Sequence, residues 1–219
     1  IDPNPLMQGK SIAKLRRAGI KVHVGLLQSE LEHLNESFIK FIKYKMPFVV
    51  TKTAQTLDGK VATALGESKW ITSLRTRRFA KQLRNEFDAI LIGITTVLKD
   101  DPGLNALHSG KRIKKVILDS RLQISPWAKL FKSTKAEDCF LVTTAQADSE
   151  TIASFEKKGV HVIICPQRQG RLDLQWLFKN LAKREITSVL IEGGPTVIGN
   201  ALKSKVVDKM HIYIAPKIM

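Results

Sequence analysis

The stretch Ile191-Glu-Gly-Gly-Pro-Thr-Val-Ile-Gly-Asn200 joins a predicted strand to a predicted helix. Two glycines at such a junction let the backbone approach a ligand closely. Pro195 suits the first helical position, because the N–H that it lacks has no helical partner there. The N–H groups beyond it carry the positive end of a helix dipole of roughly half a charge. The stretch therefore predicts an anion site with Glu192 beside it.

Strand-like and helix-like runs alternate along the chain from residue 48 onward. The predicted strands are Phe48–Thr53, Ala89–Ile92, Lys115–Asp119, Phe140–Thr143, Val160–Ile164, Ser188–Ile191 and His211–Ala215. The predicted helices are Leu74–Phe87, with Ser73 as N-cap, Ser149–Lys158, Leu174–Lys183 and Pro195–Lys203. This alternation predicts an α/β layer fold with a largely parallel sheet. Ligands of such sheets bind at the carboxyl ends of the strands, where the polar, glycine-bearing segments fall here.

The first 45 residues follow a different pattern. They predict a helix over Ser11–Ala18 closed by Gly19, a strand over Ile20–Val24 and an amphipathic helix over Gln28–Lys43. Met46-Pro47 then breaks the pattern, so we expect a domain boundary near residue 45. Ile1-Asp-Pro-Asn4 is not a typical start, and the chain stops directly after a strand. We therefore expect both ends to be truncated.

Composition narrows the range of function classes. The net charge of +16 favours anionic partners, but aromatic residues make up only 6% and the basic runs are dispersed. A solvated basic surface is the preferred interpretation, with no nucleic acid as the main partner. No apolar run approaches the ~20 residues of a membrane span. Cys139 and Cys165 lie in apolar runs, which predicts buried free thiols and a cytoplasmic location.

Several common catalytic motifs are absent. The first strand is not followed by a dinucleotide-binding glycine fingerprint, and Asn200-Ala201 replace the Lys and Ser/Thr of a P-loop. The sequence shows no nucleophile with an obvious histidine partner and no cluster of metal ligands. The isolated polar groups that remain are Lys52, Asp58, Asp100, Asp101, Asp119 and Glu192. They suit a reaction carried by a cofactor, although Asp58-Gly59 and Asp101-Pro102 also fit plain turns.

Six ordered motifs are more specific than these single residues. They are Lys52-x-Ala54-x-Thr56-Leu-Asp-Gly59, Gly66-Glu-Ser-Lys-Trp-Ile-Thr72, Thr96-Val-Leu-x-Asp-Asp-Pro102, Leu118-Asp-Ser120, Glu192-Gly-Gly-Pro-Thr196 and Tyr213-Ile-Ala-Pro-Lys217. Together they closely resemble the reductase domain of the bifunctional riboflavin biosynthesis deaminase-reductase. The resemblance implies a dihydrofolate-reductase-like three-layer α/β fold with a mostly parallel central sheet over residues 46–219.

Residues 1–45 resemble the end of that family's deaminase domain, an α/β domain of the cytidine-deaminase type. The resemblance rests on Asp2-Pro-Asn-Pro5, Gly9-Lys10, Leu15-Arg-x-Ala-Gly19-Ile20 and Val24-Gly25. The family's zinc-binding segments lie upstream of this part. We therefore expect no metal ligands in this chain and zinc only in the missing deaminase part.

The resemblance implies a reaction and a set of site residues. NADPH would reduce 5-amino-6-(5-phosphoribosylamino)uracil to its ribitylamino product, and the intact protein would also deaminate the preceding 2,5-diamino-6-ribosylamino-4-pyrimidinone 5'-phosphate. The expected cofactor-binding residues are Ala54, Trp70, Thr96, Asp100, Ser120, Gly194, Pro195, Thr196, Val197, Ile198, Gly199 and Asn200. The expected substrate-binding residues are Ser68, Arg84, Leu104 and Glu192. Lys52, Asp100 and Glu192 would act near the reacting centre, and a homo-oligomer is expected because family members commonly form one.

One position departs from the family pattern. Leu107 stands where the family usually has an arginine that helps to hold the substrate, and His108, Lys111 or Arg112 could replace that arginine. Leu107 also leaves open a related NAD(P)H reductase of the same fold with another substrate. The charge of +16 leaves open a non-enzymatic basic module that binds RNA or an acidic partner.

Overall fold

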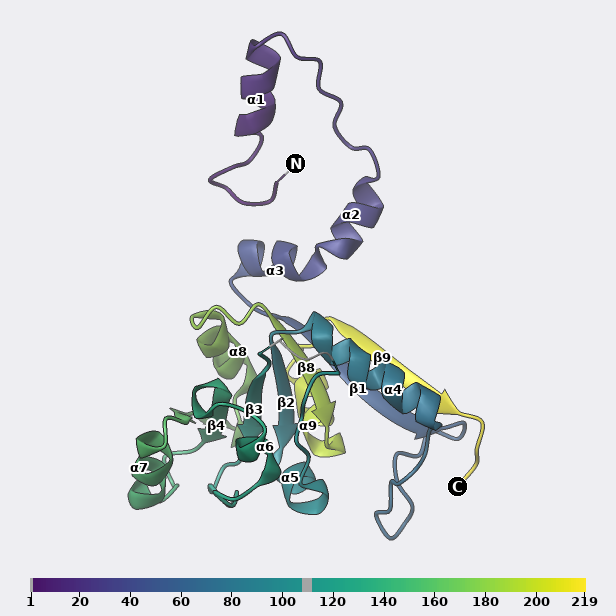
Figure 1. Ribbon diagram of the computed structural model, residues 1–219, viewed down its shortest axis with the longest axis vertical. Coiled ribbons are helices and arrows are strands. Elements are labelled where there is room, and N and C mark those ends of the chain that lie inside the picture. The colour runs from purple at the N-terminus through teal and green to yellow at the C-terminus, as the bar shows by residue number, and fades with distance from the viewer. Residues whose placement is uncertain (1, 108–111) are drawn as a thin grey trace.

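Seven parallel strands form one sheet in the computed structural model, which describes residues 2–107 and 112–219. Across the sheet the order is β5-β4-β3-β2-β8-β1-β9, as Figure 1 shows. The strands are β1 (Phe48–Thr56), β2 (Ala89–Gly93), β3 (Lys114–Leu118), β4 (Cys139–Thr143), β5 (His161–Ile164), β8 (Ser188–Gly193) and β9 (Lys209–Ala215). A separate antiparallel hairpin pairs β6 (Gln167–Arg168) with β7 (Arg171–Leu172).

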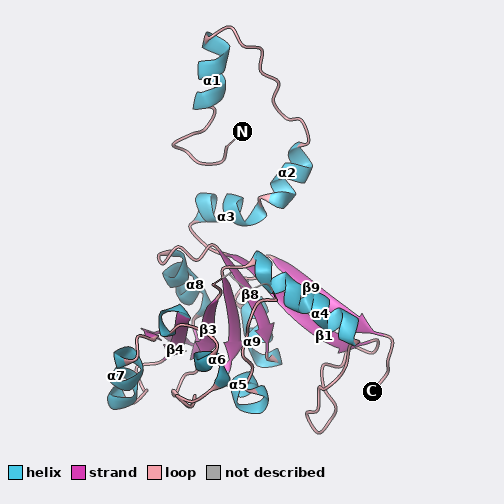
Figure 2. Cartoon of the chain, viewed as in Figure 1, coloured by secondary structure: helices cyan, strands magenta, loops and turns pink. Residues whose placement is uncertain are grey.

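Helices cover both faces of the sheet, which gives three layers (Figure 2). One face carries α4 (Leu74–Leu83), α5 (Ile94–Asp100), α6 (Lys129–Lys132) and α7 (Ser149–Lys157), with the 3-10 turns η1 (Arg84–Glu86) and η2 (Ala136–Asp138). The other face carries α8 (Leu174–Ala182) and α9 (Pro195–Lys203). Leu174, Leu177, Phe178 and Leu181 of α8 recur at helical spacing and are fully buried. Their burial against the sheet accounts for the position of α8.

The centre of the sheet is apolar on both faces. Val189, Leu190 and Ile191 of β8 have no exposed surface. Val189 and Ile191 pack towards α8 and α9, whereas Leu190 packs with Leu83 and Phe87 at the end of α4. A parallel strand covered on both faces must be apolar at every position, so this run belongs in the interior of the sheet.

The structure confirms the predicted α/β architecture and corrects several elements. The strand predicted over Ile20–Val24 is wrong: these residues are irregular, mostly exposed and paired with no strand that the structure describes. The helix predicted over Gln28–Lys43 is two helices, α2 (Gln28–Leu34) and α3 (Glu36–Tyr44). They part at Asn35, whose side-chain amide donates to Leu31 O at 2.8 Å. Asparagine competes in this way for backbone groups and disfavours helix interiors.

The helix predicted over Leu74–Phe87 is also shorter than expected. It ends at Leu83 and tightens into η1, and its predicted N-cap is confirmed because Ser73 Oγ accepts from Thr76 N at 3.2 Å. The sequence analysis missed α5, α6, η2 and the β6–β7 hairpin. All four are at most seven residues long, too short for a helical or strand periodicity to be recognised.

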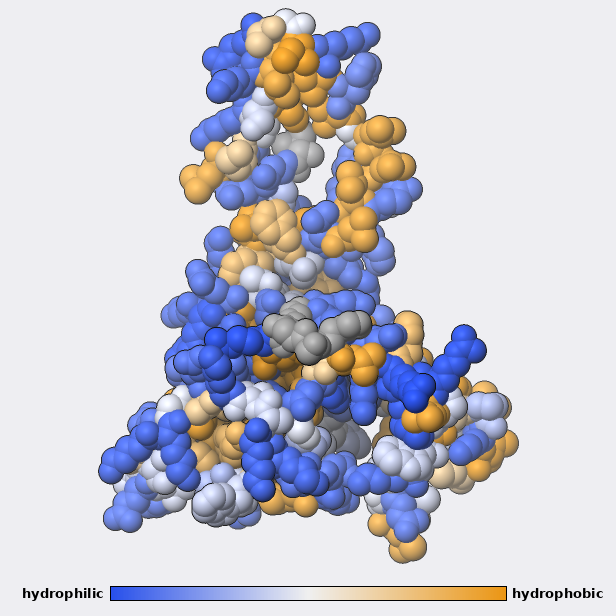
Figure 3. Space-filling view, in the orientation of Figure 1, coloured by the Kyte–Doolittle hydropathy of each residue, from blue (hydrophilic) through white to orange (hydrophobic). Residues whose placement is uncertain are grey.

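The N-terminal segment extends away from the sheet (Figure 1). Its helices α1 (Lys10–Arg17), α2 and α3 contain no buried residue. Apolar side chains such as Leu26 and Leu34 are exposed on it, and Figure 3 shows orange apolar residues along this segment. Two ion pairs, Lys40–Asp208 and Glu36–Lys209, hold α3 against the start of β9. None of the helices in the described residues is long and apolar enough to span a membrane.

Asp88 links β2 to β8 at the amino ends of the strands. Its Oδ2 accepts from Thr187 N at 2.9 Å, Thr187 Oγ1 at 2.6 Å and Ser188 N at 3.2 Å. Its own backbone N–H donates to Ser188 Oγ at 3.0 Å. One carboxylate oxygen therefore aligns the starts of two neighbouring strands.

We expect Asp88→Ala to lower the free energy of unfolding by about 2 kcal/mol, because it leaves three partly buried donors without their acceptor. Urea unfolding monitored by circular dichroism measures the change. Glu156→Ala, which removes an exposed carboxylate of α7, is the control. Equal losses in the two variants would show that the link between the strands contributes nothing.

Candidate active site at the carboxyl edge of the sheet

The end of β8 lies at the point where the topology of the sheet reverses. The helices that follow β1 and β2 cover one face, and the helix that follows β8 covers the other. A crevice at such a switch point is the usual ligand site of an open α/β sheet. Thr51 of β1 pairs with Ile191 of β8, so the next residues, Lys52 and Glu192, are neighbours across the two strands. The topology thus brings together two of the three predicted catalytic residues.

An ion pair connects Glu192 to the helical layer. Arg84 Nε lies 2.6 Å from Glu192 Oε1 and Arg84 Nη2 lies 2.8 Å from Oε2, so the contact is bidentate. The side chains are only 13% and 9% exposed. Arg84 Nη1 donates to Asn105 O at 2.8 Å, which fixes the guanidinium plane from a third direction. Two predicted substrate-binding residues therefore contact each other directly and hold each other in one orientation.

The start of α9 forms the second part of the site. Pro195 has no N–H, and the N–H groups of Val197 and Ile198 donate to Gly194 O at 3.0 and 3.2 Å. Thr196 therefore carries the first-turn N–H that these bonds leave for an anion.

The packing around this turn leaves little room for larger residues. A Cβ added at Gly93, at the end of β2, would lie 2.8 Å from Val197 Cγ2, and one at Gly194 would lie 3.4 Å from Thr96 Oγ1. Thr96 in α5 and Gly194 thus lie side by side, as expected if both line one cofactor site. A backbone N–H at a helix N-terminus without a side chain in front of it fits a phosphate group.

The loop between β1 and α4 holds another part of the predicted site. Trp70 is 62% exposed, and the Arg77 guanidinium lies 4.1 Å from the centroid of its ring. Arg77 Nη1 also donates to Thr72 O at 2.9 Å. Lys69 Nζ lies 2.7 Å from Asp100 Oδ1 at the end of α5. The loop therefore contacts α4 and α5, and it carries Ser68, which is exposed.

The remaining predicted site residues lie in different surroundings. Ser120 follows β3, and its carbonyl accepts from Thr144 Oγ1 at 3.0 Å. Ala54 in β1 pairs with Tyr213 of β9. Asn200 Nδ2 donates to Leu172 O of the hairpin at 3.4 Å. Leu104 is buried in the core, so its side chain is packed against protein rather than facing the crevice.

Three residues near the site escaped the site prediction. Asn105 is a contact of Arg84, and Arg77 is the contact of Trp70. Tyr213 has a buried hydroxyl that contacts no hydrogen-bond partner among the described residues, and burial raises its pKa, with a further rise from the charge of Glu192. Tyr213 could have been found from the motif Tyr213-Ile-Ala-Pro-Lys217, whereas local sequence gives no signal for the other two.

The structure describes Leu107 and only one of the three residues expected to replace the usual arginine. Its side chain is 46% exposed. Arg112, one candidate substitute, instead pairs with Asp138 at 2.9 Å and with Glu137. The other candidates, His108 and Lys111, lie outside the described residues. The described part of the chain contains no group of three His, Cys, Asp or Glu side chains that could hold a metal ion.

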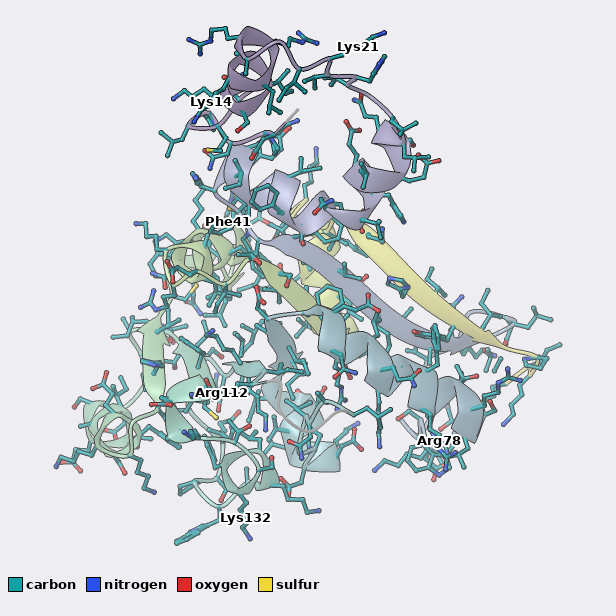
Figure 4. The ribbon with its side chains drawn as sticks, turned by 45° about the horizontal axis from the view of Figure 1, so that its top comes forward. Lys14, Lys21, Phe41, Arg78, Arg112 and Lys132 are labelled. Atoms are coloured by element: carbon teal, nitrogen blue, oxygen red, sulfur yellow. The ribbon has the colours of Figure 1, made fainter. Side chains whose placement is uncertain are left out.

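We expect Arg84→Met to lower the free energy of unfolding by about 3 kcal/mol, because it leaves the buried Glu192 carboxylate unpaired. The double variant Arg84→Met with Glu192→Leu should recover most of that loss, since no lone charge remains. Urea unfolding of both variants measures the two effects. Arg78→Met, at an exposed position of the preceding helix α4 (Figure 4), is the control. If Arg84→Met were as stable as Arg78→Met, the ion pair with Arg84 would not be needed to keep Glu192 buried.

Comparisons with known proteins agree with this architecture. A family model described as the RibD C-terminal domain matches residues 47–219. The riboflavin biosynthesis protein RibD of Actinobacillus pleuropneumoniae is 40% identical over 219 residues, which are all of this chain and 58% of that protein.

Solved structures show the same similarity. Acinetobacter baumannii RibD has a TM-score of 0.84 at 33% identity, and all of this chain matches 60% of it. A Thermotoga maritima protein, described as a diaminohydroxyphosphoribosylaminopyrimidine deaminase/5-amino-6-(5-phosphoribosylamino)uracil reductase, has a TM-score of 0.82 at 32% identity, with 99% of this chain covering 58% of it. The chain thus spans about three fifths of the length of these relatives, and over residues 47–219 it belongs to the RibD C-terminal domain family.

Proposed function

We propose that this chain carries the NADPH-dependent reductase of riboflavin biosynthesis, which converts 5-amino-6-(5-phosphoribosylamino)uracil to its ribitylamino product. The observation that carries the proposal is the convergence of the Arg84–Glu192 pair, Lys52 and the start of α9 at one switch point. The reductase named in the description of the Thermotoga maritima protein supports the same reaction. The start of α9 suits the binding of a phosphate, and the charged side chains beside it suit a polar substrate that receives a hydride from the cofactor.

The cofactor half of the site uses the first turn of α9. The residues from Gly194 to Asn200 would hold phosphate groups through the Thr196 N–H and the positive end of the helix dipole. Thr96 and Ser120 follow β2 and β3, and Ala54 and Trp70 lie in and after β1, so a dinucleotide lying along the carboxyl edge would reach all four. Asp100, through its contact with Lys69, would hold the loop of Trp70 close to this path.

The substrate half uses the polar groups beside β8. When bound, NADPH supplies a hydride to C1′ of the ring-opened ribosyl imine, and the imine nitrogen takes up a proton. Glu192 would accept hydrogen bonds from the pyrimidine or the ribose, with Arg84 holding both carboxylate oxygens in place. Lys52 presents an ammonium group from the neighbouring strand. Ser68 would contact the substrate from the loop after β1, and Leu104 would do so only through its backbone, because its side chain is buried.

The wider assignments rest on the same resemblance. We assign residues 1–45 to the end of a deaminase domain and residues 46–219 to the reductase domain, supported by a family match that begins at residue 47 and by the absence of buried residues in α1, α2 and α3. The intact protein would then also be a zinc-dependent deaminase, with zinc outside this chain. The free thiols of Cys139 and Cys165 fit a cytoplasmic protein. We also propose that the intact protein forms a homo-oligomer.

Two other functions remain as alternatives. A reductase of the same fold with a different substrate is favoured by Leu107, which leaves the usual arginine position without a charge. A basic module for RNA is favoured by the net charge alone. Its cations are dispersed: Lys14 lies on α1, Arg78 on α4 and Lys132 on α6, at well-separated places in Figure 4. A nucleic-acid surface instead needs basic side chains gathered on one face.

The reaction can be tested with the intact protein, NADPH and the deaminated phosphoribosylaminopyrimidine, following the loss of NADPH absorbance. We expect oxidation of NADPH that depends on the pyrimidine. Glu192→Gln should lower kcat/KM roughly 10- to 100-fold, the value of one or two hydrogen bonds to a charged group, while NADPH still binds.

A matched pair of variants tests the phosphate-binding turn. Gly93→Ala should weaken NADPH binding, because its Cβ would push Val197 and the start of α9. Adding Val197→Ala removes the contacting methyl group and should restore binding, which calorimetry measures. Protein that turns over no pyrimidine and binds no NADPH would reject the reductase.

The variant Leu107→Arg tests whether the phosphate of the proposed substrate binds beside position 107. If the substrate phosphate lies beside this position, the new charge should lower KM about tenfold, as expected from a charge-assisted hydrogen bond of about 1.5 kcal/mol. Leu107→Gln, polar but uncharged, is the control. A KM that is equal in both variants would favour a different substrate for this chain.

A further inference from the structure

Lys115 is a buried lysine that no step above has used. It lies in β3 and is only 1% exposed, between Ile90 of β2 and Cys139 of β4. Its ammonium group has four oxygen atoms within hydrogen-bond distance. Nζ donates to Gly103 O at 2.7 Å and Ser133 Oγ at 3.0 Å, with longer contacts to Leu130 O at 3.3 Å and Asn105 Oδ1 at 3.4 Å.

These partners belong to two segments that meet over the sheet. Gly103 and Asn105 lie in the loop after α5, whereas Leu130 and Ser133 lie in and after α6. Ser133 Oγ also lies 3.0 Å from Gly103 O, so the two segments contact each other as well as the lysine. Leu104, between the two loop residues, has a φ of 53° and a buried side chain. The ammonium group therefore fixes a loop whose backbone is in a sparsely populated conformation.

The same loop reaches the candidate active site. The carbonyl of Asn105 accepts from Arg84 Nη1 at 2.8 Å, and Arg84 donates to both carboxylate oxygens of Glu192. Hydrogen bonds thus connect Lys115 to loop 103–105, the loop to Arg84, and Arg84 to Glu192. An apolar residue at position 115 could fill the same space, but it could not hold the Gly103 and Asn105 oxygens.

The electrostatics around Lys115 agree with this arrangement. Burial lowers the pKa of Lys115 to about 8, and the charge of Arg84 in η1 acts in the same direction. Cys139 in β4 and Asp138 in η2 act in the opposite direction and raise it. At neutral pH the side chain therefore still carries its charge and all three N–H donors.

We propose that Lys115 is a positioning residue of the reductase, which holds loop 103–105 so that Asn105 O orients Arg84 and, through it, Glu192 towards the substrate. This inference rests on the proposed function. It assigns a role in substrate binding to a side chain that does not itself touch the substrate.

The test compares Lys115→Met with Lys114→Met in the intact protein. Lys114 is the preceding residue of the same strand and is partly exposed, so its variant controls for loss of a charge from β3. We expect KM for the phosphoribosylaminopyrimidine to rise about 10- to 100-fold in Lys115→Met, as for loss of a charged hydrogen bond. NADPH affinity, measured separately by calorimetry, should stay within about twofold, because the hydrogen bonds of Lys115 Nζ go to none of the proposed cofactor-binding residues.

The pH dependence gives a readout that a purely structural role would not change. Raising the pH from about one unit below the pKa of Lys115 to about one unit above it removes one of its three donors. The substrate KM of the wild type should therefore rise more over this range than that of Lys115→Met. Equal pH dependence, or an unchanged KM in the variant, would overturn the proposal.

A milder variant covers the case in which Lys115→Met does not fold. Ser133→Ala removes one partner of Lys115 and the contact with Gly103 O while the lysine stays in place. We expect a severalfold rise in substrate KM, and a KM equal to that of the wild type would again overturn the proposal. If the wild type itself binds NADPH but does not turn over the pyrimidine, the proposed function fails rather than the role of Lys115.

Discussion

The position of β8 between β1 and β2 is the constraint on which the rest of this structure depends. Parallel strands cannot be joined by tight turns, so each connection must cross the sheet, and the chain reaches β8 only after it has formed β2 to β5. The return crossover places α8 on the face opposite α4 and α5, and the connection from β8 to β9 places α9 on the same face as α8. The carboxyl end of β8 is therefore a point where helices diverge to both faces. Open α/β sheets usually bind their ligands at such a switch point, which is why we place the candidate site there.

The ion pair between Arg84 and Glu192 lies at the carboxyl end of β8. Glu192 is the first polar side chain after the apolar run of β8, and it emerges on the face that η1 covers. A nearly buried carboxylate is unfavourable unless a cation meets it with good geometry. The bidentate contact supplies that geometry, and the carbonyl of Asn105 supplies a further acceptor for the guanidinium. These contacts hold the Arg84 and Glu192 side chains in one orientation.

The sequence predicts the parts of this arrangement that are local. Apolar runs identify each strand of the sheet, Ser73 marks the start of α4, and Gly194-Pro195 marks the start of α9. Contacts between distant segments cannot be predicted in this way. The pairing of Arg84 with Glu192 depends on the order of strands in the sheet, which local periodicity does not encode. Lys115 resembles a strand-edge lysine in the sequence, and only the packing of α6 and loop 103–105 over it makes it buried. Ile20–Val24 alternates like a strand, but no neighbouring strand is present among the described residues to pair with it.

The sheet order also has a consequence for synthesis. β1 is the first of the seven strands to leave the ribosome, but its neighbours are β8 and β9, the last two. Phe48 pairs with Ser188, and Val50 pairs with Leu190 and Lys209. β2 to β5 can form a partial sheet as they emerge, whereas β1 lacks its neighbouring strands until β8 and β9 have been synthesised. During that interval the nascent chain presents an unpaired apolar strand, the kind of segment that chaperones bind.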